Sequence, residues 1–325
     1  MKKTYPRRVR QVLEDLAAAL RAFGIDRSER VVLAYSGGLD SAALLWALCH
    51  LAPHRRPRVE AVCVDHGLRE DSAEQARRAI EVARSLGVEG RVLRVDCGGE
   101  GGVEAAARKA RYTALAEVAA GRPILTAHTA DDQAETVLYR LAKGAGIKGL
   151  GGIRPEVRIA QGRVLRPFLG VRRARLEEVV RYAEIPVVED VTNASRRYTR
   201  NRIRMDVLPA LEAAVPGASA ALARAAMLAQ RDEAYLSGRA RRWRERLRRE
   251  GGWDARGLAR LPRALGSRIV REVIAETRGR PPTARQVDAV LDLLRGGGEF
   301  RLCDEWIVLC RGGIFSLLRR PEDRG

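Results

Sequence analysis

The stretch VVLAYSGGLDSAALLWAL, residues 31–48, decides the fold. An apolar run ends at Ser36, and a second apolar run begins directly after Ser41. A strand that ends in Ser-Gly-Gly and leads into a helix presents free backbone N–H groups where the helix dipole favours an anion. Gly37 and Gly38 let the main chain approach a phosphate without an intervening Cβ. The junction therefore predicts a phosphate-binding loop at the end of a strand.

The side chains of this loop suit a nucleotide. Ser36 and Ser41 add hydroxyl donors, and Asp40 is placed to accept from a substrate group or to help hold Mg²⁺ against phosphates. The Walker pattern GxxxxGK[ST] does not occur in the chain, and GxGxxG is missing after the first strand. A tight Gly-Gly turn between packed elements is the alternative, but the complete SGGLDS pattern favours a nucleotide site built differently from the Walker loop.

Residues 29–153 alternate short apolar runs with helical patterns, which predicts an α/β fold: a Rossmann-like parallel sheet with helices on both faces. The pairs are RVVLAY with 41–51, VEAVCVD with 72–86, GRVLRVD with 104–119, and PILTAH with 131–142. Right-handed crossovers bring all four strand ends to one edge, where ligands bind in open α/β sheets. Polar residues follow every one of these strands.

The length of 325 residues favours two compact units over one. From about 154 to 210 the pattern loosens into a loop, a helix and a polar basic loop, and after Pro209 it becomes rich in Ala, Arg and Leu. We expect a nucleotide-binding catalytic domain over 1–212 and a smaller, mainly helical domain over 213–325. The alternation in residues 299–320 predicts a terminal hairpin.

The chain is strongly basic, with a formal charge of +19, which suits a polyanionic partner such as nucleic acid. The alternative is an arginine-biased surface that reflects genome composition or heat adaptation. Residues 1–16 lack the apolar stretch of a secretory signal, and no apolar run approaches membrane-spanning length, so we expect a cytoplasmic protein that does not contact a membrane. The five cysteines form no CxxC pair, so neither a disulfide scaffold nor an iron-sulfur site is indicated.

The SGGLDS loop resembles that of the PP-loop ATP pyrophosphatase superfamily, in which the loop grips the pyrophosphate end of ATP. Further stretches are similar to the tRNA(Ile)-lysidine synthetase family and follow its order: VDHGLR (64–69), EAAARKARY (104–112), TAHTADDQAET (126–136) and EDVTNASRRYTRNRIR (189–204). Thr129 departs from the pattern, since many members have a second histidine there. The resemblance implies an ATP site made of Ser36, Gly37, Gly38, Leu39, Asp40, Ser41, Asp65 and His66.

Asp132 and Glu135 are spaced i, i+3 at the start of a helix, so their carboxylates share one face and can bracket an ammonium group. In the family the corresponding pair recognises free L-lysine, and the resemblance places Asp40 and His128 in the same catalytic region. Ordinary first-turn carboxylates that complement a helix dipole are the alternative for the pair. His66 and His128 could equally be core histidines bonded to the main chain.

Several arginines suit phosphate or tRNA contacts, with a solvated surface as the alternative. Arg108 and Arg111 lie i, i+3 on one helix, and the basic loop surrounds Asn201 with arginines. We expect the phosphate or tRNA contacts to come from Arg108, Arg111, Arg200, Asn201, Arg202 and Arg204. The run RARRWRERLRRE, residues 239–250, is too rich in arginine for one buried stripe and predicts an RNA-binding face.

The resemblance implies a two-step reaction that uses ATP and Mg²⁺. The C2 carbonyl oxygen of the wobble cytidine in a CAU-anticodon isoleucine tRNA attacks the α-phosphate of ATP and releases pyrophosphate. The lysine ε-amine then attacks C2 and expels AMP, which gives lysidine and moves codon reading from AUG to AUA. The sequence leaves the oligomeric state open, with a homodimer as one arrangement. The alternatives are a 2-thiolating tRNA enzyme, which would come with paired cysteines, and a non-catalytic tRNA-binding protein on this scaffold.

Overall fold

The computed structural model describes residues 5–67, 71–95, 103–159, 162–188, 196, 199–303 and 305–319, with the backbone alone for 103–109. The chain forms two compact units, which divide between Gln230 and Arg231. This division lies within the long helix α10 (Ala218–Arg246), whereas the composition changes near residue 212. Among the described residues, no helix is both long enough and apolar enough to span a membrane.

A six-stranded sheet forms the centre of the first unit, in the order β3-β2-β1-β4-β6-β5. Its strands are β1 (Arg30–Ala34), β2 (Arg58–Asp65), β3 (Glu89–Arg94), β4 (Ile124–Leu125), β5 (Glu156–Ile159) and β6 (Gly162–Leu165). All neighbours are parallel except β5 and β6, which form an antiparallel hairpin. The predicted parallel sheet is confirmed, and the hairpin lies where the sequence pattern loosens.

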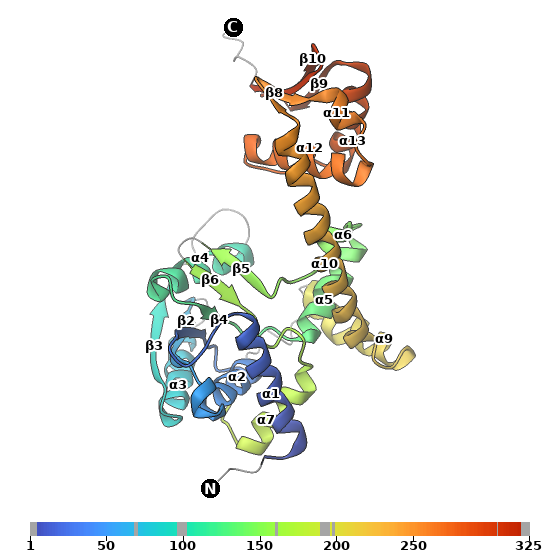
Figure 1. Cartoon of the computed structure of the whole chain (residues 1–325). Helices are drawn as coiled ribbons and strands as arrows, with labels where there is room; N and C mark the ends of the chain where they lie inside the picture. Colours follow the sequence, from blue (N-terminus) through green and yellow to red (C-terminus); the bar gives the residue numbers. More distant parts are fainter. Residues whose placement is uncertain are drawn as a thin grey trace. The chain divides into compact units, whose positions relative to one another are not determined.

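Helices cover both faces of this sheet, because successive strand residues point to opposite sides (Figure 1). On one face, Leu33 packs in a core with α1 (Arg7–Ala22), α2 (Leu39–His50), α3 (Ser72–Ser85) and α7 (Arg173–Ala183). On the other face, Val32 and Ile124 pack against Leu115 of α4 (Val103–Ala119). The expected doubly covered, Rossmann-like arrangement is thereby confirmed.

The first unit contains further helices. They are η1 (Pro53–Arg55), α5 (Ala130–Ala142), α6 (Ile147–Leu150), α8 (Thr199–Arg202), the π-helix η3 (Ile203–Val207) and α9 (Leu208–Ala214). Helix α5 follows β4 directly and starts at a capping box formed by Thr129 and Asp132. The turn from α9 to α10 is held by Glu212, whose carboxylate accepts from the Gly217 and Ser219 backbone N–H groups.

The second unit combines helices with an antiparallel sheet. Its helices are α11 (Ala255–Ala259), α12 (Arg263–Arg278) and α13 (Ala284–Gly296). Its sheet has the order β7-β8-β11-β10-β9, from β7 (Arg248–Arg249), β8 (Gly252–Asp254), β9 (Gly298–Cys303), β10 (Trp306–Arg311) and β11 (Ile314–Arg319). Residues 299–320, where the alternation predicts a hairpin, thus contribute three strands to a larger sheet that buries Phe315 and Val308.

Candidate active site

A cavity of about 660 Å³ lies at the carboxyl edge of the parallel sheet, where β1 and β4 end. It is lined by the phosphate-loop residues Ser36, Gly38, Leu39, Asp40 and Ser41, by Thr126, Ala127, His128 and Asp132 after β4, and by Arg111, Tyr112, Arg173, Val188 and Arg204 among others. The topology therefore gathers residues from separate sequence motifs around one space. This is the edge at which the sequence predicts a ligand.

The phosphate loop depends on Gly37. Its φ of +77° lies in the left-handed region, and a Cβ there would come within 2.8 Å of the Ala79 Cβ and 3.0 Å of Val188 Cγ2. The Gly37 carbonyl accepts from the Val188 backbone N–H at 3.0 Å, which ties the loop to the segment after α7. Only glycine fits this position.

The hydroxyl groups of the loop are held together. Ser36 Oγ and Ser41 Oγ lie 3.2 Å apart, and Ser41 Oγ donates to the Gly38 carbonyl at 2.9 Å. Gly38 is the N-cap of α2, so the first turn of that helix begins at the cavity wall. Backbone donors at a helix start, flanked by hydroxyls, can bind phosphate oxygens.

Asp40 is the carboxylate of this loop. Burial raises its pKa to about 6, while Arg173, with Nη1 3.6 Å from Asp40 Oδ2, acts in the opposite direction. Its Oδ1 is buried and has no hydrogen-bond partner among the described residues. An unpartnered carboxylate oxygen beside a phosphate loop suits Mg²⁺, which proteins often hold with one carboxylate plus substrate phosphates. The described residues contain no cluster of three or more side chains that would hold a metal without such phosphates.

The acidic pair on α5 is engaged by two arginines. Arg204 Nε donates to Glu135 Oε1 at 2.5 Å, and Arg204 Nη2 lies 3.1 Å from Asp132 Oδ1. Arg200 Nε donates to Glu135 Oε2 at 3.1 Å, and its Nη2 lies 3.7 Å from Asp132 Oδ1. Two guanidinium groups therefore balance two carboxylates, of which Glu135 is only 1% exposed. Burial opposes the charge of Arg204, yet its bonds to Glu135 and Asp132 raise its pKa.

Asp132 also caps its own helix. Its Oδ2 accepts from the Thr129 N–H at 2.8 Å and from the Thr129 hydroxyl at 2.9 Å, while Oδ1 is turned to the arginines. Burial alone would raise the pKa of Asp132, but His128, the Thr129 N–H and the arginines lower it. The carboxylate is therefore ionised at neutral pH, and it is both a first-turn helix carboxylate and part of the cavity wall.

The two histidines differ in position. His128 lines the cavity, and its Nδ1 lies 2.9 Å from Thr126 Oγ1. Asp65 is the last residue of β2 and His66 follows it, and neither lines the cavity. Asp65 accepts from the Gly67 N–H at 2.9 Å. Burial and the neighbouring Arg111 lower the pKa of His66. Arg111, which lines the cavity, thus also lies close enough to His66 to affect its charge.

The remaining predicted residues divide into two groups. Asn201 and the exposed Arg202 lie on α8, away from the cavity lining. The side chains of Glu104 and Arg108, residues 68–69 and 189–195, and Arg197 lie outside the described residues.

Sequence reasoning missed Arg173, which lines the cavity and faces Asp40. It also missed a second cavity of about 390 Å³, lined by Glu135, Arg172, Glu212 and Ser219 together with Arg173 and Arg204. Arg173 and Arg204 line both cavities and so stand at the boundary between them. Nothing in the run VRRARLEE distinguishes Arg173 from its neighbouring arginines, because only the packing of α7 against α2 brings it to Asp40.

The fold and the phosphate loop define the chain as a PP-loop protein, and the family model described as a PP-loop domain matches residues 1–211. A tRNA(Ile)-lysidine synthase of Thermobifida fusca is 40% identical over 303 residues, which cover 90% of this chain and 88% of that protein. One from Novosphingobium aromaticivorans is 37% identical over 96% of this chain and 97% of its own length. The chain belongs to the tRNA(Ile)-lysidine synthase family.

Among solved structures, the U34-tRNA thiolase NcsA from Methanococcus maripaludis with its [4Fe-4S] cluster has a similar fold. The TM-score is 0.58 at 15% identity, over 70% of this chain and 82% of the thiolase. At this identity the similarity concerns the fold alone.

Proposed function

We propose that this protein is the ligase that joins lysine to C2 of the wobble cytidine in a CAU-anticodon isoleucine tRNA, with ATP converted to AMP and pyrophosphate. The observation that carries the proposal is that one cavity is lined by both the SGGLDS loop and Asp132 of the acidic pair. Membership of the tRNA(Ile)-lysidine synthase family supports it. The family relationship favours this reaction over 2-thiolation and over a non-catalytic tRNA-binding role.

In the first step the cytidine O2 forms a bond to the α-phosphorus, and the bond from that phosphorus to the pyrophosphate oxygen breaks. Backbone N–H groups at the start of α2, with Ser36 and Ser41, would bind the phosphates and stabilise the charge that gathers on pyrophosphate. Asp40 would hold Mg²⁺, which when bound neutralises phosphate charge. His128 and Arg111, which also line the cavity, are placed to contact the nucleotide or the base.

In the second step the neutral lysine Nζ attacks C2, and the C2–O bond to AMP breaks. The acidic pair would bind the incoming ammonium and accept its proton. Since Arg200 and Arg204 already balance both carboxylates, the ammonium must take the place of one of them. Arg200 is the better candidate, because its side chain is 41% exposed and makes one hydrogen bond to Glu135, at 3.1 Å, whereas Arg204 makes two, at 2.5 and 3.3 Å.

The tRNA would be bound by residues outside the cavity. The exposed Arg202 beside Asn201, and the arginines of residues 239–250, supply positive charge for phosphates. We assign ATP chemistry to residues 1–212 and much of the tRNA affinity to residues 213–325. A homodimer stays a prediction.

Incorporation of labelled lysine tests the proposal most directly. The intact protein, ATP and an isoleucine tRNA transcript with a CAU anticodon should yield labelled tRNA, whereas a methionine tRNA with the same anticodon should not. Pyrophosphate exchange into ATP that depends on the isoleucine tRNA but not on lysine would identify the adenylation step. If lysine is never incorporated while the tRNA binds, the binding-protein alternative holds.

A further inference from the structure

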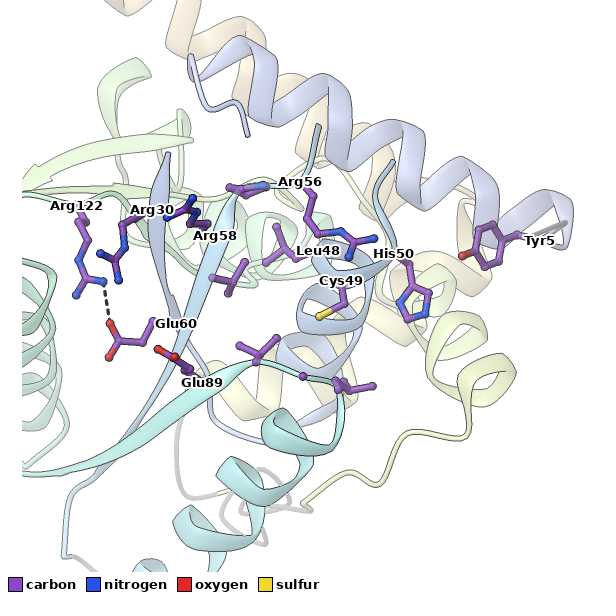
Figure 2. Close-up of a pocket in the computed structure, with 15 residues that line it drawn as sticks. Tyr5, Arg30, Leu48, Cys49, His50, Arg56, Arg58, Glu60, Glu89 and Arg122 are labelled. Atoms are coloured by element: carbon purple, nitrogen blue, oxygen red, sulfur yellow. Dashed lines mark hydrogen bonds and ion pairs between the residues drawn. The ribbon is translucent and has the colours of Figure 1, made fainter. Parts of the chain in front are cut away.

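A cavity of about 790 Å³ lies at the opposite edge of the parallel sheet, where β1 and β2 begin (Figure 2). Its walls come from the starts of β1, β2 and β3, the end of α2 and the turn before β4. It shares no lining residue with the candidate active site. The five residues of β1 separate the two sites by roughly 15 Å, since a strand rises about 3.3 Å per residue.

Two arginines stand directly opposite each other in this cavity. Arg30 of β1 and Arg58 of β2 are register partners in parallel strands, so their side chains leave the same face of the sheet. Paired strands lie about 4.8 Å apart, and like charges in such a position are destabilising. Among the described residues, neither arginine forms an ion pair with a carboxylate. The fold therefore maintains a local repulsion that an anion would relieve.

The neighbouring carboxylates do not supply this anion. Glu60 lies two residues beyond Arg58 on the same face, but its Oε2 binds Arg122 at 2.8 Å and its Oε1 binds Arg91 at 2.5 Å. Burial opposes ionisation of Glu60, yet these arginines lower its pKa. Glu89, the register partner of Glu60 on β3, forms no ion pair with Arg30 or Arg58 in the described part of the chain.

The other end of the cavity is aromatic, and Figure 2 shows Tyr5 and His50 far from Arg122 with Arg56 between. The His50 ring stacks on Trp46, with centroids 4.1 Å apart and planes 16° apart, and Tyr5 meets it edge-on at 6.3 Å. Arg56 also lines the cavity, and its Nε and Nη2 both donate to the Leu51 carbonyl. Rings at one end and paired guanidinium groups at the other match a ligand with a base and a phosphate.

We propose that this cavity binds a nucleotide unit, with its phosphate on Arg30 and Arg58 and its base toward Tyr5 and His50. Arginine provides planar donor groups for phosphate oxygens, and aromatic side chains accept any base by stacking. Such a unit is carried either by an RNA strand or by a free nucleotide. The RNA source rests on the proposed tRNA substrate, and binding of tRNA by the parent protein tests that substrate separately.

The test compares two double variants of the full chain with the same change of net charge. The variant Arg30→Ser/Arg58→Ser removes the proposed phosphate contacts, and the control Arg27→Ser/Arg181→Ser removes two exposed arginines away from the cavity. Both should unfold at the parent's melting temperature or above, because no described ion pair is lost. Each protein is then titrated with tRNA over a range of salt concentrations, and its ATP sites are counted by equilibrium dialysis.

If RNA is the ligand, Arg30→Ser/Arg58→Ser should reduce the slope of log affinity against log salt by about 0.7 to 0.9, as expected when one phosphate is no longer neutralised. If a free nucleotide is the ligand, the parent and the control should bind two ATP molecules and this variant one. Either result, absent from the control, supports the proposal. If the cavity variant matches the control in both measurements, the proposal is wrong.

Discussion

The Nη1 of Arg173, the first residue of α7, lies 3.6 Å from Oδ2 of Asp40 in the first turn of α2. Burial nevertheless dominates and raises the Asp40 pKa to about 6. A carboxyl group with a higher pKa in the folded state than in the unfolded chain destabilises the fold once it ionises. Without ligands, the protein should therefore lose stability as the pH rises through the interval from about 4 to above 6.

Replacing Asp40 with asparagine should remove that cost. At pH 8 we expect Asp40→Asn to raise the free energy of unfolding by about 1 to 3 kcal/mol, the value of a shift near two pKa units less the lost contact with Arg173. Below pH 4 the gain should vanish, because Asp40 is then protonated in both states. Denaturant titrations across this range measure the difference. An equal gain at every pH would contradict the ionisation account.

The same variant should lose adenylation, because Asp40 is the carboxylate at the phosphate loop. Asp40→Asn should abolish tRNA-dependent exchange of pyrophosphate into ATP and leave tRNA affinity within about twofold of the parent's, since Asp40 contributes no phosphate contact. The control is Glu177→Gln, which removes another carboxylate near Arg173 but not from the cavity lining. Equal loss of tRNA affinity in Asp40→Asn would argue against this assignment.

The acidic pair should affect lysine use and not adenylation. Asp132→Asn should weaken the response to lysine by roughly ten- to a hundredfold, the value of one charge-assisted contact of about 1.5 to 3 kcal/mol. Glu135→Gln should do the same and also lower thermal stability, because Glu135 is buried against Arg204. Adenylated tRNA should accumulate in both, as lysine enters only the second step.

Asp131→Asn is the matched control for the pair, because Asp131 is also a first-turn carboxylate of α5 but binds Arg172. It should keep the parent's response to lysine. If Asp132→Asn behaves in the same way, or if adenylation fails together with lysine use, the pair does not bind lysine.

Removing Arg200, the more exposed of the two arginines that contact the acidic pair, should strengthen the binding of lysine. Arg200→Ala leaves Asp132 and Glu135 with Arg204 alone, so we expect the half-saturating lysine concentration to fall several-fold. Arg202→Ala, two residues further along α8 and in no described ion pair, should leave that concentration unchanged. Each should reduce the salt slope of tRNA binding by about 0.7 to 0.9 if it contacts a phosphate. A weaker response to lysine in Arg200→Ala would mean that Arg200 helps to hold the substrate.

The residue at which the chain is truncated should determine the thermal stability of the first unit. A chain that ends after Gln230 keeps the hydrogen bond from the Gln230 amide to the Ile153 carbonyl at 2.8 Å and the Ser219–Glu212 contact at 2.7 Å. A chain that ends at residue 212 loses both, and it should melt at a lower temperature. The longer truncation should bind tRNA more weakly and with a smaller salt slope, because it lacks all the arginines of residues 239–250. An unchanged slope would place the tRNA contacts in the first unit.

The sequence by itself determined the local elements and the loop that identifies the fold. The apolar run to Ala34, the glycine at position 37 and the apolar run of α2 depend on neighbours in the chain, so the apolar pattern and the SGGLDS motif were enough to predict them. The antiparallel hairpin of β5 and β6 at the edge of the parallel sheet was not predictable, because each of these strands has only four residues. Such short runs leave too little alternation to distinguish a strand from a loop.

Only the tertiary structure decided which charges meet. Asp132 and Glu135 were predicted to share a helix face, yet their engagement by Arg200 and Arg204 depends on how residues 199–207 pack against α5. The contact of Arg173 with Asp40 likewise joins residues 133 positions apart in the chain. Ion pairs of this kind form only between side chains that the fold brings together. The pKa of Asp40 likewise rises because the folded chain buries its carboxyl group, which no pattern of neighbouring residues reveals.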